Sequence, residues 1–126
     1  MTTHILALGG GGFSMSNRGE PTALDRHILD LSGKSSPLVC FAPTAAADDP
    51  VYVNRFLAAY SALGVRTMVL TLWQGAAESV ERLSQADVIV SGAGSAANLM
   101  ALWRMHGVDH IIRRMTSSAD DVVLAG

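Results

Sequence analysis

The sequence has few charged residues, a single cysteine and no apolar run long enough to cross a membrane. Charged residues make up 16% of the chain, and Arg113-Arg114 is the only adjacent basic pair, so we predict no nucleic-acid partner. Cys40 has no second cysteine with which to form a disulfide, which fits a reducing compartment. The N-terminus also lacks a basic leader segment, so we predict a cytoplasmic protein that contacts no membrane.

Apolar residues, in contrast, are abundant: they make up 49% of 126 residues, enough for one domain over residues 1–126. Short apolar runs alternate with amphipathic segments, without a linker or repeat. This alternation predicts a three-layer α/β sandwich with a mostly parallel sheet. The predicted strands are residues 5–8, 37–42, 66–72, 87–90 and 122–125, and the predicted helices are residues 21–31, 50–63, 76–83, 95–105 and 108–115.

Several residue types that often carry chemistry have simpler interpretations here. None of the four histidines stands at metal-ligand spacing from a cysteine or carboxylate, so we predict no metal and no other cofactor. Asp48 and Asp49 could form an acid pair, but both are explained as capping residues before Pro50 at a helix start. Trp103 has the spacing of a core residue.

Residues 9–14, GGGGFS, follow the first predicted strand. A dinucleotide fingerprint would need G-x-G-x-x-G and an acidic residue after the second strand, and neither is present. A Walker A loop is excluded because no Gly-Lys-Ser/Thr follows. The run is therefore interpreted as a turn that lets the backbone approach a neighbour or a ligand closely.

A second small-residue run, SGAGSAAN at residues 91–98, follows the fourth predicted strand and opens a helix. Small residues leave backbone N–H groups accessible, and the helix N-terminus adds partial positive charge. Such a turn can bind an anion, a carboxylate or the oxyanion of acyl transfer. A plain tight turn capped by Ser95 is the other interpretation of these residues.

Three runs taken together resemble the peptidase E (aspartyl dipeptidase) family of serine peptidases. They are GGGGFS at 9–14, CFAPTA at 40–45 and, most specifically, NLMALWRMHGVD at 98–109. The last run, VVLAG at 122–126, resembles the strand that leads into the nucleophile of that family. The similarity covers essentially the whole chain but only the amino-terminal part of the family domain.

This resemblance implies a class I glutamine amidotransferase-like, flavodoxin-like fold that is incomplete at its C-terminal side. It also implies a serine-type peptidase that hydrolyses short peptides with an N-terminal aspartate. Gly126 matches the first glycine of the family's Gly-x-Ser-x-Gly elbow, so the nucleophilic serine, its histidine and its acid are expected beyond it. Residues 1–126 alone are therefore predicted to be inactive.

The resemblance carries over the oxyanion side of the site. Gly94 matches the backbone N–H donor of the family's oxyanion hole, and Gly92, Ala93 and Ser95 match the positions that surround the substrate. Ala93 replaces a glycine of the family motif, while Ser95 and Ala96 replace an asparagine and a threonine. These departures put the positioning of the substrate in question.

Two other functions remain open. The changed residues at 95 and 96 are compatible with a catalytically inactive relative, or with a module that binds a small carboxylate. A mononucleotide-binding flavodoxin-like domain is a further possibility. We also expect the last strand to be exposed and unpaired on its far side, and therefore to pair with further polypeptide or with a second copy in a homodimer.

Overall fold

The computed structural model describes residues 2–118 and 121–126. Within them, all ten predicted elements are present, and three short 3-10 turns are added. The strands are β1 (Thr3–Leu6), β2 (Leu38–Ala42), β3 (Arg66–Val69), β4 (Val88–Ser91) and β5 (Val122–Ala125). The helices are α1 (Ala23–Leu31), α2 (Pro50–Ala62), α3 (Ala76–Arg82), α4 (Ala96–Met105) and α5 (Val108–Thr116), and the 3-10 turns are η1 (Gly12–Met15), η2 (Thr44–Ala46) and η3 (Leu83–Gln85).

Helices α1, α2 and α4 begin at residues whose side chains cap them. Thr22 and Asp25 form a reciprocal capping box at α1, which satisfies two backbone N–H groups of the first turn. Asp49 caps α2 ahead of Pro50, and Ser95 caps α4 by accepting from the Asn98 N–H.

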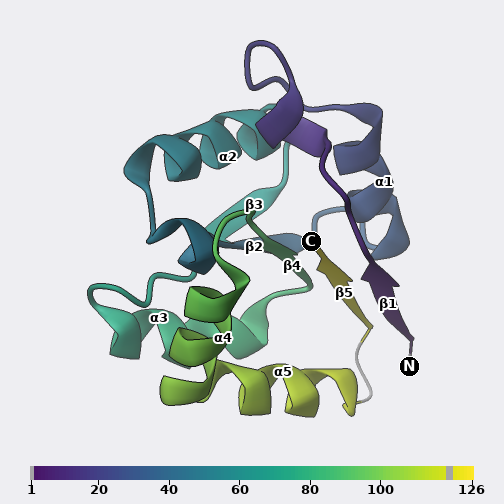
Figure 1. Ribbon diagram of the computed structural model, residues 1–126. Coiled ribbons are helices and arrows are strands. Elements are labelled where there is room, and N and C mark those ends of the chain that lie inside the picture. The colour runs from purple at the N-terminus through teal and green to yellow at the C-terminus, as the bar shows by residue number, and fades with distance from the viewer. Residues whose placement is uncertain (1, 119–120) are drawn as a thin grey trace.

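All four strand pairings are parallel, and the order across the sheet is β1-β5-β4-β2-β3. The chain runs from β1 to β2 and β3 through helices on one face, then returns through helices on the other (Figure 1). After β3 the chain reverses its direction across the sheet, and its helices change to the other face. Because both change at the same point, all the crossovers keep the same handedness. The predicted three-layer α/β sandwich is confirmed, with α1 and α2 in one outer layer and α3, α4 and α5 in the other.

Alternate strand residues form the two cores. Val39 and Phe41 of β2 pack with α1 and α2, whereas Cys40 and Ala42 pack with the opposite layer. This alternation explains why the strand is apolar without interruption, since both of its faces are covered. Burial raises the pKa of the Cys40 thiol to about 12, so this thiol is a packing group rather than a nucleophile.

The expectation of an unpaired last strand is wrong. β5 lies inside the sheet, paired with β1 on one side and with β4 on the other. Val122, Val123 and Ala125 are each at most 5% exposed. The edges of the sheet are β1 and β3, so β5 offers no free edge for association with a second chain.

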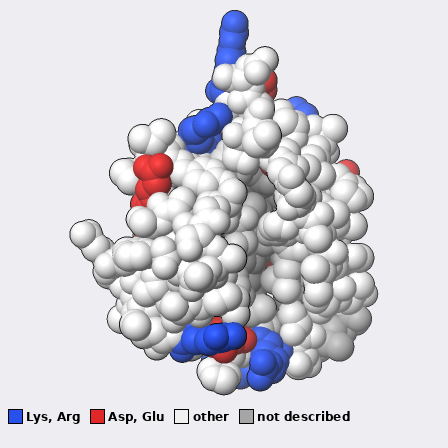
Figure 2. Space-filling model, in the orientation of Figure 1, with Lys and Arg blue, Asp and Glu red and all other residues white. Residues whose placement is uncertain are grey.

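One apolar surface is nevertheless open, beside α4. A groove of about 310 Å³ runs over β1 and β5, and its lining includes Ile5, Leu99, Trp103 and Leu124. Ile5 is 75% exposed there. In Figure 2 charged side chains gather toward the rim of this face, and its uncharged centre is hollowed.

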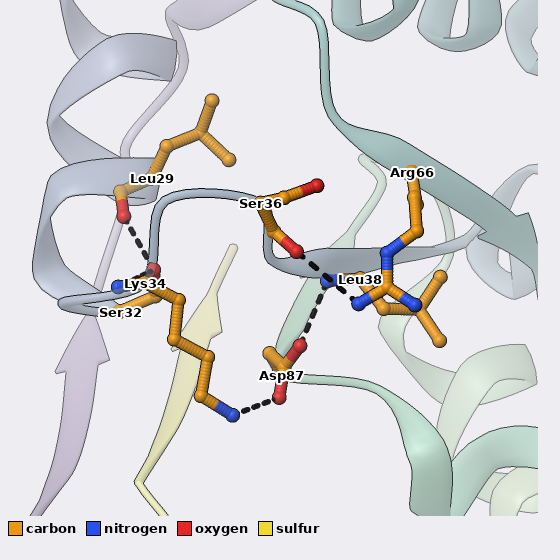
Figure 3. A network of polar contacts seen from close by, with 7 residues as sticks. All are labelled: Leu29, Ser32, Lys34, Ser36, Leu38, Arg66 and Asp87. Carbon is orange, nitrogen blue, oxygen red and sulfur yellow. Dashed lines mark hydrogen bonds and ion pairs between the residues drawn. The ribbon is translucent and has the colours of Figure 1, made fainter.

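A polar network around Asp87 joins the amino ends of β2 and β4, and Arg66 of β3 donates to the Ser36 carbonyl beside it (Figure 3). Asp87, just before β4, accepts from the Leu38 N–H at 2.8 Å and forms an ion pair with Lys34. Its own backbone N–H donates to the Leu38 carbonyl, and its carbonyl accepts from Val123. One residue thereby holds the starts of β2, β4 and β5 together.

Candidate functional site

A cavity of about 150 Å³ lies at the carboxyl ends of β1, β4 and β5. It brings together three segments that are far apart in sequence: the glycine run after β1, the turn after β4, and Gly126 after β5. The loops after β1 and β4 continue into helices on opposite faces of the sheet, and such a divide is where open α/β sheets bind ligands. The lining residues are Leu8, Gly10, Gly11, Gly12, Phe13, Ser14, Asp25, Ile28, Tyr52, Val90, Ser91, Gly92, Ala93 and Gly126.

The glycine run forms one wall of this cavity because of its backbone conformation. Gly10, Gly11 and Gly12 have φ values of +113°, +121° and +69°, a region that L side chains rarely adopt. A Cβ on Gly12 would lie 3.0 Å from Oδ1 of Asp25. The interpretation of residues 9–14 as a turn for close backbone approach therefore holds, and the neighbour approached is Asp25.

Asp25 is a buried carboxylate, 2% exposed, on the wall of the cavity. Its oxygens accept from the Tyr60 hydroxyl at 2.9 Å and from the backbone N–H and hydroxyl of Thr22 at 2.8 and 3.0 Å. Burial, together with the neighbouring Asp25 charge, raises the pKa of Tyr60, so its hydroxyl remains a donor. These bonds fix α1 and α2 beneath the glycine run.

Aromatic rings support the same wall. Phe13 of η1 packs against Phe41, Phe56 and Tyr60, with ring centroids 5.8–5.9 Å apart and near-perpendicular planes. Tyr52 adjoins this cluster, 5.0 Å from Phe41. The edge-to-face arrangement gives the glycine-rich segment a rigid base.

The turn after β4 is held through nearly every backbone N–H that it contains. The Gly92 N–H donates to Ala42 at 3.0 Å, and the Ser95 N–H donates to Ala45 at 2.8 Å. The Ala93 N–H donates to the Tyr52 hydroxyl at 3.1 Å. Within the described residues only Gly94, of these four, has an N–H without an acceptor, and it is exposed.

Gly94 itself lies directly on the backbone after β2. Its φ is +144°, and a Cβ there would be 2.2 Å from the Ala45 carbonyl oxygen and 2.9 Å from the Ala46 nitrogen. Glycine is thus the residue that this contact requires. The same η2 segment is held by Thr44, whose hydroxyl accepts from Trp103 Nε1 and whose carbonyl accepts from Trp73 Nε1, both at 3.1 Å.

The two adjacent aspartates have different roles. Asp49 caps α2 as predicted, by accepting from the Val51 N–H. The capping role assigned to Asp48 is wrong: with φ at +55° it instead accepts from the N–H groups of Leu72 and Trp73 at 2.8 and 2.9 Å. These bonds tie the loop after β3 to the residue that follows η2, and β3 itself ends at Val69, earlier than predicted.

The predicted site residues are only partly gathered. Gly92, Ala93 and Gly126 line the cavity, whereas Gly94 and Ser95 lie next to it in the chain and outside its lining. Sequence reasoning missed Tyr52 and Asp25, which reach the cavity from α2 and α1. The one signal for Asp25 was its position three residues after Thr22, where a capping box places a carboxylate.

Two features that the described residues lack bear on other functions. In this part of the chain, no group of three or more His, Cys, Asp or Glu side chains is placed to hold a metal ion. No helix in residues 2–118 and 121–126 has the length and apolarity of a membrane span.

Comparisons with known proteins place the chain among peptidases. A sequence model described as Peptidase family S51 matches residues 5–126. The uncharacterized peptidase YgaJ of Bacillus subtilis (strain 168) is 38% identical over 123 residues, which make up 97% of this chain and 52% of that protein.

Solved structures match in fold. A putative peptidase E protein from Listeria monocytogenes EGD-e has a TM-score of 0.70 at 16% identity, over 100% of this chain and 58% of that one. A peptidase from an acI-B1 actinobacterium has a TM-score of 0.69 at 14% identity, over 96% and 52% of the two chains. The predicted class I glutamine amidotransferase-like, flavodoxin-like fold is confirmed. The chain spans about half the length of the curated relative that it matches.

Proposed function

This chain belongs to peptidase family S51, and on that basis we propose that it forms the oxyanion-binding part of a serine-type peptidase resembling dipeptidase E. The proposed substrates are short peptides with an N-terminal aspartate. The carrying observation is the meeting of the glycine run, the 92–95 turn and Gly126 around one cavity at the carboxyl edge of the sheet.

Gly94 is the proposed oxyanion donor. Its N–H has no acceptor among the described residues, while its neighbours Gly92, Ala93 and Ser95 donate to protein groups. Those three bonds and the contact with Ala45 fix the orientation of the turn before any substrate binds. A donor fixed in advance in this way stabilises developing negative charge without reorganisation during the reaction.

The proposed reaction needs a nucleophile from polypeptide outside these residues. A serine in the elbow that follows the strand matching β5 attacks the scissile carbonyl carbon, and a histidine takes its proton. The carbonyl oxygen becomes an oxyanion that accepts from the Gly94 N–H, and the histidine then returns the proton to the leaving amine. Water repeats these steps on the acyl-enzyme and frees the acid.

Hydrolysis of Asp-p-nitroanilide tests the proposal. Protein expressed from the complete gene is expected to release nitroaniline faster from this substrate than from Ala-p-nitroanilide, and residues 1–126 alone are expected to release none. Clear turnover by the 126-residue chain would show that the nucleophile lies within it, contrary to the proposal.

An amide-to-ester replacement at Gly94 tests the donor directly, because it removes the N–H without adding a Cβ. Loss of one oxyanion donor is expected to lower kcat by about 10²–10³-fold. The same replacement at Gly75, which precedes α3 and is not part of the 92–95 turn, serves as the control. Equal kcat for the two proteins would remove Gly94 from the mechanism.

A binding function is the second candidate, and it is favoured by Ser95 and Ala96 where the family has asparagine and threonine. In that case the 92–95 turn holds a small carboxylate without hydrolysing it. Saturable binding of succinate by the product of the complete gene, without turnover of any aspartyl peptide, would favour this candidate over the peptidase.

We also propose that the protein works in the cytoplasm. Its single cysteine is buried as a thiol, so a reducing environment does not alter the fold. Cell fractionation with an antibody against the protein tests the location, and recovery in a secreted fraction would contradict it.

A further inference from the structure

A second cavity lies beside the first and shares a wall with it. Its volume is about 330 Å³, and Ser14, Tyr52 and Ala93 line both cavities. The remaining lining residues are Met15, Asp49, Val51 and Arg55. A peptide lying across the shared wall would therefore place one part in each cavity.

The two cavities differ in charge. The first is lined by a single ionisable carboxylate, Asp25, and by no basic residue. The wall of the second carries one basic residue, Arg55, and one acidic residue, Asp49. A substrate carboxylate therefore finds its only positive partner among these lining residues in the second cavity.

Arg55 is exposed, and its guanidinium contacts the segment around Ser16 and Gly19. One Nη donates to the Ser16 carbonyl at 3.3 Å, and the guanidinium lies over Gly19, where an added Cβ would be 3.4 Å from Nε. Within the described residues the one ion pair is Lys34–Asp87, so no carboxylate lies within ion-pair distance of Arg55. Asp49, on the same wall, already accepts from the Val51 N–H.

The rim of this cavity is apolar and exposed. Met15 is 70% exposed and Val51 is 66% exposed, although neither contributes to a core. They are two of the six large apolar side chains that the described fold leaves exposed, and both line this one cavity. Exposed apolar side chains beside a cationic side chain suit a ligand that has both an apolar group and a carboxylate.

We propose that this second cavity is a substrate subsite, in which Arg55 binds a carboxylate of the short peptide and Met15 and Val51 contact an apolar side chain. The inference rests on the proposed peptidase function, because it takes the ligand to be a peptide. The carboxylate comes either from the C-terminus of the peptide or from its N-terminal aspartate side chain. A bidentate guanidinium–carboxylate pair serves both.

Binding titrations with the product of the complete gene test the subsite without depending on turnover. The probes are Asp-Leu, its C-terminal amide, and Asn-Leu. Titration calorimetry measures the affinity for each from the fast heat of binding after injection, before the slower heat of hydrolysis develops. Arg55→Gln is expected to weaken Asp-Leu binding by about tenfold to a hundredfold, as loss of a charged hydrogen bond does. Arg55→Lys, which keeps the charge but loses the fork, should fall between.

The probes identify the source of the carboxylate. If the C-terminus binds Arg55, the amide will bind weakly to the unaltered protein and will be insensitive to Arg55→Gln. If the side chain binds, Asn-Leu will behave in that way instead. Arg26→Gln, an exposed change on α1 outside both linings, is the matched control. Equal affinities of Arg55→Gln and Arg26→Gln proteins for Asp-Leu would overturn the subsite.

The same titrations separate this inference from the proposed function. Arg55-dependent binding without hydrolysis would end the peptidase proposal and leave the subsite standing. Hydrolysis whose KM is unchanged by Arg55→Gln would do the opposite. Circular dichroism and melting curves of each variant confirm that the compared proteins are folded.

Discussion

Asp87 lies at the amino ends of the strands and Gly94 at the carboxyl ends, and each joins segments from different strands. At the amino end a carboxylate does this, through Leu38 and Lys34. At the carboxyl end the segments are joined by direct backbone contact, because Gly94 has no side chain and lies against the backbone of Ala45. One end is held by side-chain charge, and the other by close backbone approach that leaves an N–H group exposed.

The two ends of the sheet therefore have different roles. At the amino end, Asp87 and Lys34 bind groups of the protein itself. At the carboxyl end the glycines keep backbone donors near the surface, and larger side chains from α1 and α2 support them from below. Stability and the proposed chemistry thus use different parts of the same sheet.

Gly94→Ala is expected to have the largest effect, because it removes the close backbone approach at the carboxyl end. The new Cβ would lie 2.2 Å from the Ala45 oxygen, at a φ of +144°. We expect a loss of about 3 kcal/mol or more in the free energy of unfolding, measured by urea denaturation, because clash and backbone strain add. Gly64→Ala is the control: its φ is also positive, at +75°, but its Cβ would meet nothing within 4 Å. Equal losses would mean that backbone strain alone, and not contact with η2, explains Gly94.

Tyr60→Phe tests how much the hydrogen bond beneath the glycine run contributes to stability. It removes the hydroxyl that donates to buried Asp25 at 2.9 Å, and leaves a carboxylate oxygen without that partner. We expect about 2 kcal/mol of destabilisation by thermal or urea unfolding. Tyr52→Phe, which frees the exposed Ala93 N–H to bind water, should cost less than about 1 kcal/mol. A larger effect at Tyr52 would reverse this interpretation.

Asp87→Asn tests the amino end. Asparagine keeps one oxygen acceptor but loses the charge that pairs with Lys34, in a side chain that is 16% exposed. The expected loss is about 1.5 kcal/mol by urea denaturation, with no change in the affinity of the cavity for Asp-Leu. A change in that affinity would show that the two ends of the sheet are coupled.

Acid pH should produce the smallest effect, through the same carboxylate. Partial burial tends to raise the pKa of Asp87, but the Leu38 N–H and the Lys34 charge outweigh it, so the pKa lies below its ordinary value. The stabilisation is therefore present above about pH 4, where the unfolded carboxyl titrates, and is lost as the pH falls through the lower folded-state pKa. The difference in unfolding free energy between the original protein and Asp87→Asn should shrink as the pH falls from 5 to 2. A constant difference would exclude this linkage.

Much of the fold could be predicted from the sequence because its signals are local. Uninterrupted apolar runs such as residues 38–42 marked buried strands, and Asp49-Pro50 marked the start of α2. The position of β5 between β1 and β4 could not be read in this way, since strand order depends on pairings across more than a hundred residues. The prediction of an unpaired last strand failed for that reason.

The site was predicted less completely than the fold. The small residues at 92–94 pointed to backbone donors, and two of the three line the cavity. Tyr52 and Asp25 were missed because their partners, Ala93 and Tyr60, lie 41 and 35 residues away. A local pattern explained Asp25 fully as a helix cap and gave no indication that it also borders a cavity.

Thr44 binds the indole N–H of Trp73 through its carbonyl and that of Trp103 through its hydroxyl. The sequence contains two tryptophans, so every indole in the chain touches the same residue of η2. Intrinsic fluorescence of this protein is therefore a local spectroscopic probe, whose emission reports the surroundings of the segment on which Gly94 rests. An emission shift on adding peptide, with no change in the far-ultraviolet circular dichroism signal, would record a movement of that segment rather than global unfolding.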